Sequence, residues 1–139
     1  MEYRLFDTTI IVRLDKGDRI AESLLTVAKK ENIKAAEISG IGATDDFETG
    51  VFDPAKSSYV HFQHKGNHEI NSLVGNLTTK DGQPYLHLHI TSTDGDGKVV
   101  GGHLFDGTIS LTAEIFINIQ NTRLERRFDG ELGINRISF

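Results

Sequence analysis

The chain contains no cysteine and no tryptophan, and it has only two prolines among its 139 residues. Without cysteine, both a disulfide framework and any thiolate metal site are excluded. The prolines lie in "DPAK" and "QPYL", so no proline-rich linker divides the chain, and no repeat recurs at a solenoid period. We therefore expect a single domain over residues 1–139.

Long hydrophobic runs are also missing. No stretch approaches the roughly 18 apolar residues that a membrane-spanning helix needs. The opening residues, "MEYRLFDTTI", have neither the basic start nor the apolar core of a signal peptide. We expect a cytoplasmic protein with no membrane partner.

Positive charge is in the minority, with 15 Lys and Arg against 20 Asp and Glu and a net charge of -5. A molecule of this charge repels a phosphate backbone, so direct nucleic-acid binding is disfavoured. The most basic stretch, "NTRLERRFDG", contains Arg123, Arg126 and Arg127, but acidic residues lie among them. This stretch is predicted to be the solvated end of a strand or helix.

The patterns that are present predict an α+β fold. "TTIIVRL" is rich in β-branched residues and predicts a strand. In "DRIAESLLTVAKKENI", Ile20, Leu24, Val27 and Ala28 recur at helical spacing, which predicts the main helix. Short alternating or apolar runs fill most of the remaining chain, and a turn or bulge is expected at the glycines of "SGIGAT". We expect a mainly antiparallel sheet of about seven strands with one main helix packed on it.

Two histidines lie on one predicted strand, "PYLHLHIT". Leu86, Leu88 and Ile90 alternate with His87 and His89. Side chains two residues apart point to the same face of a strand, so both histidines are predicted on the face opposite the core. A His-x-His pair in this position can bind one metal ion, although the motif alone is common.

A third histidine depends on the turn "TDGDGK". If residues 95–97 form a three-residue loop with Gly97 in the left-handed conformation, Asp94 pairs with Lys98 and His89 lies opposite His103. All three imidazoles would then project into one small volume. A two-residue loop would instead send His103 to the core face, and a bulge in the following "GG" could shift the pairing again.

The spacing of His87, His89 and His103 leaves two interpretations open. Three neutral imidazoles with a free fourth position are the ligand set of a catalytic-type zinc site, and imidazole also suits iron, nickel, copper or cobalt. Alternatively, the three are polar residues on a solvated or subunit-facing strand. His61, His64 and His68 form a second group, which we expect at the surface, with His68 a minor metal-ligand candidate.

Several stretches together resemble a known family: "RLDKGDRIAESLLTVAKKENIKAAEISGIGA", "SLVGN", "LHLHI", "DGDGKVVGGHL" and "TAEIFI". In order and with few gaps, residues 9–117 resemble the PPC domain (plants and prokaryotes conserved, DUF296) of the stand-alone prokaryotic type. The resemblance implies an antiparallel sheet with flanking helices and a homotrimer with shared clefts. It also implies a divalent metal, often zinc, held by histidines that match His87, His89 and His103.

Plant members of this family place an AT-hook, an Arg-Gly-Arg-Pro core, before the domain, and this chain has no such core. Their partner-binding stretch, Gly-Arg-Phe-Glu-Ile-Leu, corresponds here to "GNHEIN", with Asn67 and His68 in place of Arg and Phe. The plant partner role is therefore not expected to carry over.

The predicted fold is also similar to that of acetolactate decarboxylase, in which a strand His-x-His and a later histidine hold zinc. Such chemistry needs carboxylates or an arginine near the metal. Glu69 is the catalytic candidate and Glu114 is the second, and the alternative for each is a structural or interface carboxylate.

Two functional hypotheses follow. The first is a homotrimeric metal-binding protein whose three-histidine site binds or acts on a small molecule. The second is a DNA-binding or transcription-associated regulatory module, in which an oligomer could gather its arginines into a local patch. The sequence identifies no substrate and does not establish whether the protein is an enzyme.

Overall fold

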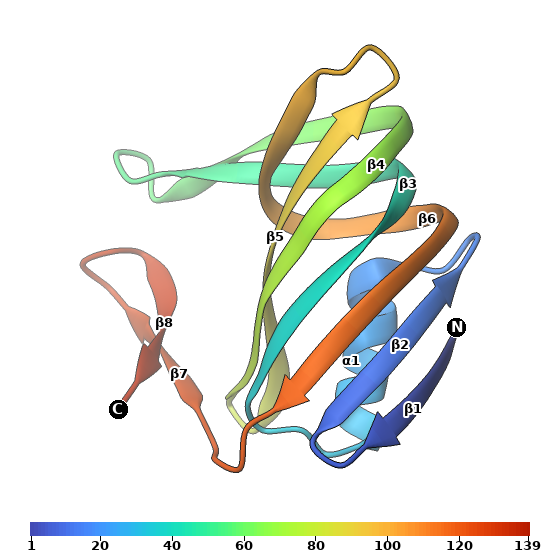
Figure 1. Ribbon diagram of the computed structural model, residues 1–139. Coiled ribbons are helices and arrows are strands. Elements are labelled where there is room, and N and C mark those ends of the chain that lie inside the picture. Colours follow the sequence, from blue (N-terminus) through green and yellow to red (C-terminus); the bar gives the residue numbers. More distant parts are fainter.

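The computed structural model describes residues 1–139 and shows a strongly bent, mainly antiparallel sheet with a single helix (Figure 1). The elements are β1 (Glu2–Phe6), β2 (Thr9–Asp15), α1 (Ile20–Lys30), β3 (Ala36–Asp53), β4 (Ser58–Lys80), β5 (Gln83–Asp94), β6 (Val99–Ile119), β7 (Glu125–Asp129) and β8 (Ile134–Ser138). The predicted α+β class with one main helix is confirmed, with eight strands where about seven were expected.

Three of the strands are longer than the sequence patterns predict. Strands β3, β4 and β6 run for 18, 23 and 21 residues, each joining runs that were expected to be separate short strands. Shifts of register occur between Gly40 and Gly42 in β3 and between Ile70 and Ser72 in β4. Such β-bulges bend a strand without ending it, so the glycines of "SGIGAT" mark a bulge rather than a turn.

The long strands pair in a closed ring. Strand β3 lies between β4 and β6, while β5 pairs with the other edge of β4 and with the first five residues of β6. Within β6, His103 stands where the two pairings meet, because it is opposite both His89 of β5 and Gly50 of β3. The bend of the sheet therefore places this histidine between β5 and β3.

Helix α1 covers one face of the sheet. Its residues Ile20, Leu24, Val27 and Ala28 are fully buried, as their spacing predicts, and the helix packs against β5 and β6. Burial of each large apolar side chain contributes about 1.5–3 kcal/mol. The helix has 11 residues, and no helix is long and apolar enough to cross a membrane.

The opposite face of the sheet has no helix over it (Figure 1). Neighbouring strands place Ile11, Phe116, Ser39, Val74 and His89 opposite one another in a continuous row on that face. Of these, Ile11, Phe116 and Val74 are exposed to 37%, 43% and 47%. An apolar row beside a histidine of the predicted metal site is therefore open to contact.

Strands β7 and β8 form a separate C-terminal hairpin. In Figure 1 it stands away from the main sheet, at the left of the view. A single parallel pair, Thr79 with Glu125, joins it to β4. Side-chain hydrogen bonds of Arg126 to Thr78 and Asn76 of β4 add to this pair.

Candidate metal centre

The turn between β5 and β6 is the three-residue loop on which the third histidine depends. The amide of Asp94 donates to the carbonyl oxygen of Lys98 at 2.9 Å, and Gly97 has a φ of +80°. No bulge follows at the adjacent glycine pair, so His89 lies opposite His103. The predicted register is confirmed.

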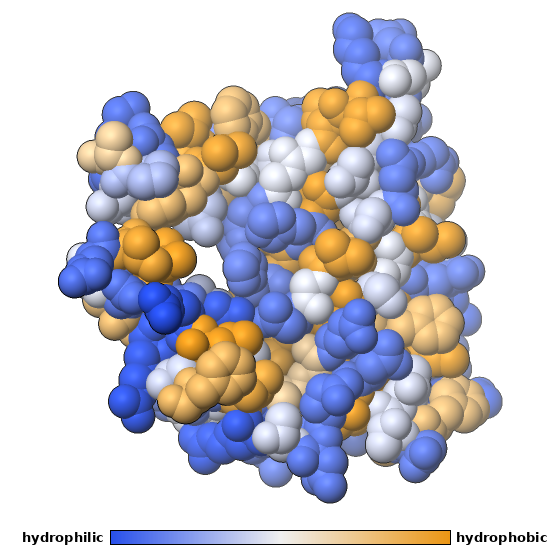
Figure 2. All heavy atoms as spheres, turned by 60° about the vertical axis from the view of Figure 1, so that its left-hand side comes forward, coloured by the Kyte–Doolittle hydropathy of each residue, from blue (hydrophilic) through white to orange (hydrophobic).

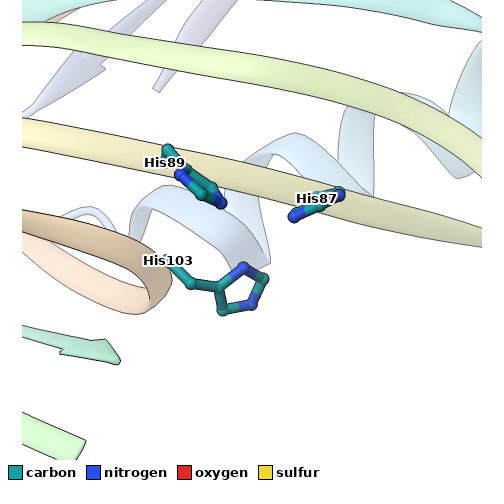
Figure 3. A group of neighbouring side chains, drawn as sticks. All are labelled: His87, His89 and His103. Carbon is teal, nitrogen blue, oxygen red and sulfur yellow. The ribbon is translucent and has the colours of Figure 1, made fainter. Parts of the chain in front are cut away.

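The three imidazoles come together across β5 and β6 (Figure 3). Ring centroids are 5.2 Å apart for His87 and His89, 5.2 Å for His87 and His103, and 5.7 Å for His89 and His103. One potential ligand atom from each ring lies within 4.8 Å of the other two. No other group of three or more potential metal ligands occurs in the chain.

Strand β4 approaches β5 closely beside these histidines. Gly75 of "SLVGN" pairs with Leu88, and a Cβ atom at this glycine would collide with the carbonyl oxygen of His87. The glycine therefore permits the backbone contact that holds the His-x-His segment in place.

Burial keeps two of the imidazoles neutral. Desolvation first, and then the nearby His87 and His89, lower the pKa of His103 to about 4. The pKa of His87 is also lowered, first by desolvation and then by the positive charge of Arg126. At neutral pH both rings can therefore offer a lone pair to a metal ion.

These residues fit a divalent metal ion. The Nδ1 atom of His103 is buried and has no hydrogen-bond partner, which is costly for a polar atom unless something binds it. Zinc binds imidazole nitrogens at about 2.0 to 2.1 Å, so small side-chain rotations would bring the three nitrogens onto one ion.

Arg126 was not predicted as part of this site. It is only 6% exposed, so the interpretation of its segment as a solvated strand end is wrong for this residue. Its Nη2 atom lies 3.5 Å from Nδ1 of His87, and its guanidinium lies 5.0 Å from the ring centre of Tyr85. No periodicity in the sequence marks it, because a partner such as Thr78 is 48 residues away.

The structure does not bring Glu69 or Glu114 beside the three histidines. Glu69 is exposed and lines a different hollow, together with His68 and Asp94, that none of the three histidines lines. Its partner on β5 is Thr93, four residues from His89 and so roughly 13 Å along the strand. Glu114 is exposed and pairs with Arg13. A catalytic role for Glu69 stays a prediction.

The second histidine group is dispersed. His61 is exposed, as expected, and its Nδ1 lies 2.6 Å from a carboxylate oxygen of Glu48. His64 is half-buried and stacks on Phe47, with ring centroids 4.6 Å apart. His68 is only 8% exposed, so the expectation of a surface residue is wrong there. Its contact with Phe47 in the core explains the burial.

Solved structures from several organisms resemble the whole chain. A protein from Bacteroides thetaiotaomicron described as a candidate DNA-binding protein is 28% identical, with a TM-score of 0.96 over 99% of this chain and 96% of that one. A PPC protein from Pyrococcus horikoshii is 32% identical, with a TM-score of 0.88 over 99% and 95%. A metal-containing protein from Archaeoglobus fulgidus is 30% identical, with a TM-score of 0.87 over 99% and 97%.

A more distant likeness confirms only the expected similarity of fold. The α-acetolactate decarboxylase from Bacillus subtilis is 16% identical, with a TM-score of 0.58 over 91% of this chain and 58% of that one. At this identity the shared feature is the course of the chain, and the decarboxylase reaction does not follow from it.

Family membership rests on sequence as well as on shape. The model of the Plants and Prokaryotes Conserved (PCC) domain matches residues 1–120. No curated protein matches the chain. The extent of the family match, together with the PPC protein from Pyrococcus horikoshii, shows that this chain belongs to the Plants and Prokaryotes Conserved domain family.

Proposed function

We propose that the protein binds one divalent metal ion, most simply zinc, through His87, His89 and His103. The observation that supports this most strongly is the buried, unpartnered Nδ1 of His103 within a group whose ligand atoms lie within 4.8 Å of one another. The similarity to a metal-containing protein of Archaeoglobus fulgidus adds support. Three protein ligands leave at least one coordination position for water or a small oxygen-bearing molecule.

Such a metal ion, when bound, polarises an oxygen atom of its ligand. The residues of the chain itself present neutral imidazoles and restrict how the rings turn. Arg126 lies beside His87, and Phe105 packs edge-on against His103 with ring centroids 5.1 Å apart. We propose that the small molecule binds next to the three histidines, beside Arg126 and Phe105.

The proposed assembly is a homotrimer. The apolar row on the uncovered sheet face, with Ile11, Phe116 and Val74 each more than a third exposed, is the surface that an identical subunit would cover. It continues to His89 through the strand pairing. Packing of subunits there would exclude water from the histidine site as well as from the apolar side chains.

Metal content tests the proposed function. Wild-type protein and the variants His87→Ala, His89→Ala and His103→Ala are dialysed against trace zinc and then analysed for bound metal. Because each variant removes one of only three ligands, we expect about one zinc per wild-type chain and much less in every variant. His61→Ala is the matched control, because it removes an exposed histidine outside the site.

The variants should remain folded without the metal, because the sheet and helix supply the hydrophobic core. Circular dichroism of each dialysed sample checks this. Equal zinc content in the wild type and in the three site variants would refute the proposed metal site.

DNA binding is the second candidate, favoured by the descriptions of relatives from Bacteroides thetaiotaomicron and Ralstonia eutropha as candidate DNA-binding proteins. The charge distribution supports it less well. The net charge is -5, Arg126 is buried, and Arg123 is paired with Glu125 at 3.2 Å. Sequence-selective binding of duplex DNA at physiological salt, measured by fluorescence anisotropy, would favour this second candidate.

A further inference from the structure

Arg126 is a buried cation without a counter-ion. Its three hydrogen bonds go to uncharged acceptors: Oγ1 of Thr78 at 2.9 Å, Oδ1 of Asn76 at 2.8 Å and the carbonyl oxygen of Asn135 at 2.8 Å. No ion pair in the structure includes it. A guanidinium stays charged in proteins, and a buried charge without a partner of opposite sign is costly.

The guanidinium has donors to spare. Its five N–H groups make three strong bonds, which leaves one N–H on each terminal nitrogen. The second N–H of Nη2 has only the contact with Nδ1 of His87, at 3.5 Å, the limit of a hydrogen bond. Two N–H groups on neighbouring nitrogens form the fork that binds a carboxylate with both its oxygens.

Arg126 lines a cavity of about 230 Å³ between the histidine site and the C-terminal hairpin. Its lining includes Tyr59, Tyr85, His87, His103, Arg126 and Asn135. Figure 2 views the molecule from the side of this hairpin and shows the surface hollowed, with hydrophilic and hydrophobic atoms around the opening. The volume is smaller than that of pockets for drug-sized ligands, which suits a molecule of few atoms.

Two residues that line the cavity also carry unsatisfied polar atoms. Only three buried side-chain polar atoms lack a hydrogen-bond partner, and two of them, Nδ1 of His103 and Oδ1 of Asn135, belong to lining residues. The amide oxygen of Asn135 can accept a hydrogen bond and has no donor within the protein, so a ligand in the cavity could supply one after a small movement of this side chain. A ligand with an anionic group and a hydroxyl group would satisfy both Arg126 and Asn135.

We propose that this cavity binds a small hydroxycarboxylate, with its carboxylate on Arg126 and its hydroxyl donating to Asn135. This inference rests on the proposed function in one respect, since a further oxygen of the ligand would occupy the free position on the metal. The C-terminal hairpin, which supplies both Arg126 and Asn135, is then part of the binding site, although it lies beyond residues 1–120, which match the family model.

Titration calorimetry with glycolate, the smallest hydroxycarboxylate, tests the proposal on the zinc-loaded protein. We expect Arg126→Gln to weaken glycolate binding roughly tenfold or more, the effect of losing a hydrogen bond to a charged group. Arg123→Gln, which changes an exposed arginine outside the cavity, should bind as the wild type does. Asn135→Ala should weaken glycolate but leave acetate, which has no hydroxyl group, unchanged.

Parallel measurements separate this inference from the metal site. Zinc content is determined in every sample, and the titrations are repeated on the protein stripped of metal. Zinc-loaded Arg126→Gln that binds glycolate as tightly as the wild type would overturn the carboxylate assignment, as would tighter binding of inorganic phosphate than of glycolate. A wild type without zinc would refute the proposed function instead, while Arg126-dependent glycolate binding to that protein would still support the cavity.

If Arg126→Gln fails to fold, the glycolate affinity of Asn135→Ala tests the proposed binding site instead. Asn135 lies on β8 at the edge of the hairpin, and its unpartnered amide oxygen makes no bond that the fold requires. Equal glycolate affinity in wild type and Asn135→Ala would overturn the role given to the hydroxyl group.

Discussion

At the scale of single residues, the histidine cluster could be predicted largely from the sequence. The alternation in "PYLHLHIT" places His87 and His89 on one face, and the residues of the turn then place His103 opposite His89. Given a three-residue loop, these two steps bring the three imidazoles together. What the sequence left open was the length of the turn loop, because a two-residue loop would have reversed the parity.

Arg126 could not be predicted in the same way. Its neighbours Glu125 and Arg127 are charged, and burial of a charged residue within such a run is unusual. The contacts that bury it come from β4, β5 and β8, which only the complete fold brings together. Long-range burial of this kind leaves no mark on local periodicity.

Protonation of His103 should couple stability to pH. Its pKa in the folded protein is about 4, whereas a histidine in the unfolded chain titrates near 6.5. Below pH 6.5 the unfolded state therefore takes up a proton that the folded state does not. We expect the metal-free protein to lose stability as the pH falls from about 6.5 to about 4. Above pH 6.5 the stability that the neutral, buried His103 contributes is fully present.

Urea unfolding of the metal-free protein at several pH values measures this effect. The variant His103→Gln should show a smaller loss over that range, and His61→Gln, at an exposed position, should follow the wild type. The same pH dependence in wild type and His103→Gln would contradict the burial of this imidazole.

At the scale of elements, the turn between β5 and β6 fixes the register of the site. Gly97 has a φ of +80°, and Gly95 does not have a positive φ. A Cβ atom added to either glycine would meet no atom of a non-adjacent residue within 4 Å. The two glycines thus differ in backbone conformation, while both have room for a Cβ atom. Residues other than glycine are strained in the left-handed region by about 1–2 kcal/mol.

We therefore expect Gly97→Ala to reduce the free energy of unfolding by about 1–2 kcal/mol. Gly95→Ala, in the same loop, should have an effect within about 0.5 kcal/mol of zero. Urea unfolding at neutral pH measures both. A larger loss for Gly95→Ala than for Gly97→Ala would show that the turn has another conformation.

The strands illustrate what local patterns cannot give. Sequence runs such as "FETGVFD" and "YVHFQH" are correctly predicted as strands, but they belong to β3 and β4, which continue far beyond them. Continuation depends on bulges and on pairing with distant strands, as at Thr44, which pairs with Ile109 and whose hydroxyl donates to the carbonyl oxygen of Thr108 at 2.7 Å. The type of each element is therefore local information, while its length is a property of the sheet.

At the scale of the whole molecule, the sheet is covered by a helix on one face only. We expect the other face to be buried in a homotrimer, so light scattering at micromolar concentration should return three times the mass of the chain. Phe116→Asp would place a charge in the middle of the apolar row and should lower the mass to that of a monomer. A monomer mass for the wild type would contradict the proposed assembly.

The central claim is that His87, His89 and His103 bind one metal ion together. Anomalous diffraction from crystals of the zinc-loaded protein, recorded on both sides of the zinc absorption edge, tests it most directly. We predict one strong anomalous peak per chain, at about 2.0 to 2.1 Å from a nitrogen of each of the three imidazoles. The absence of a peak at this position, or a peak only at another place on the chain, would contradict the three-histidine metal site.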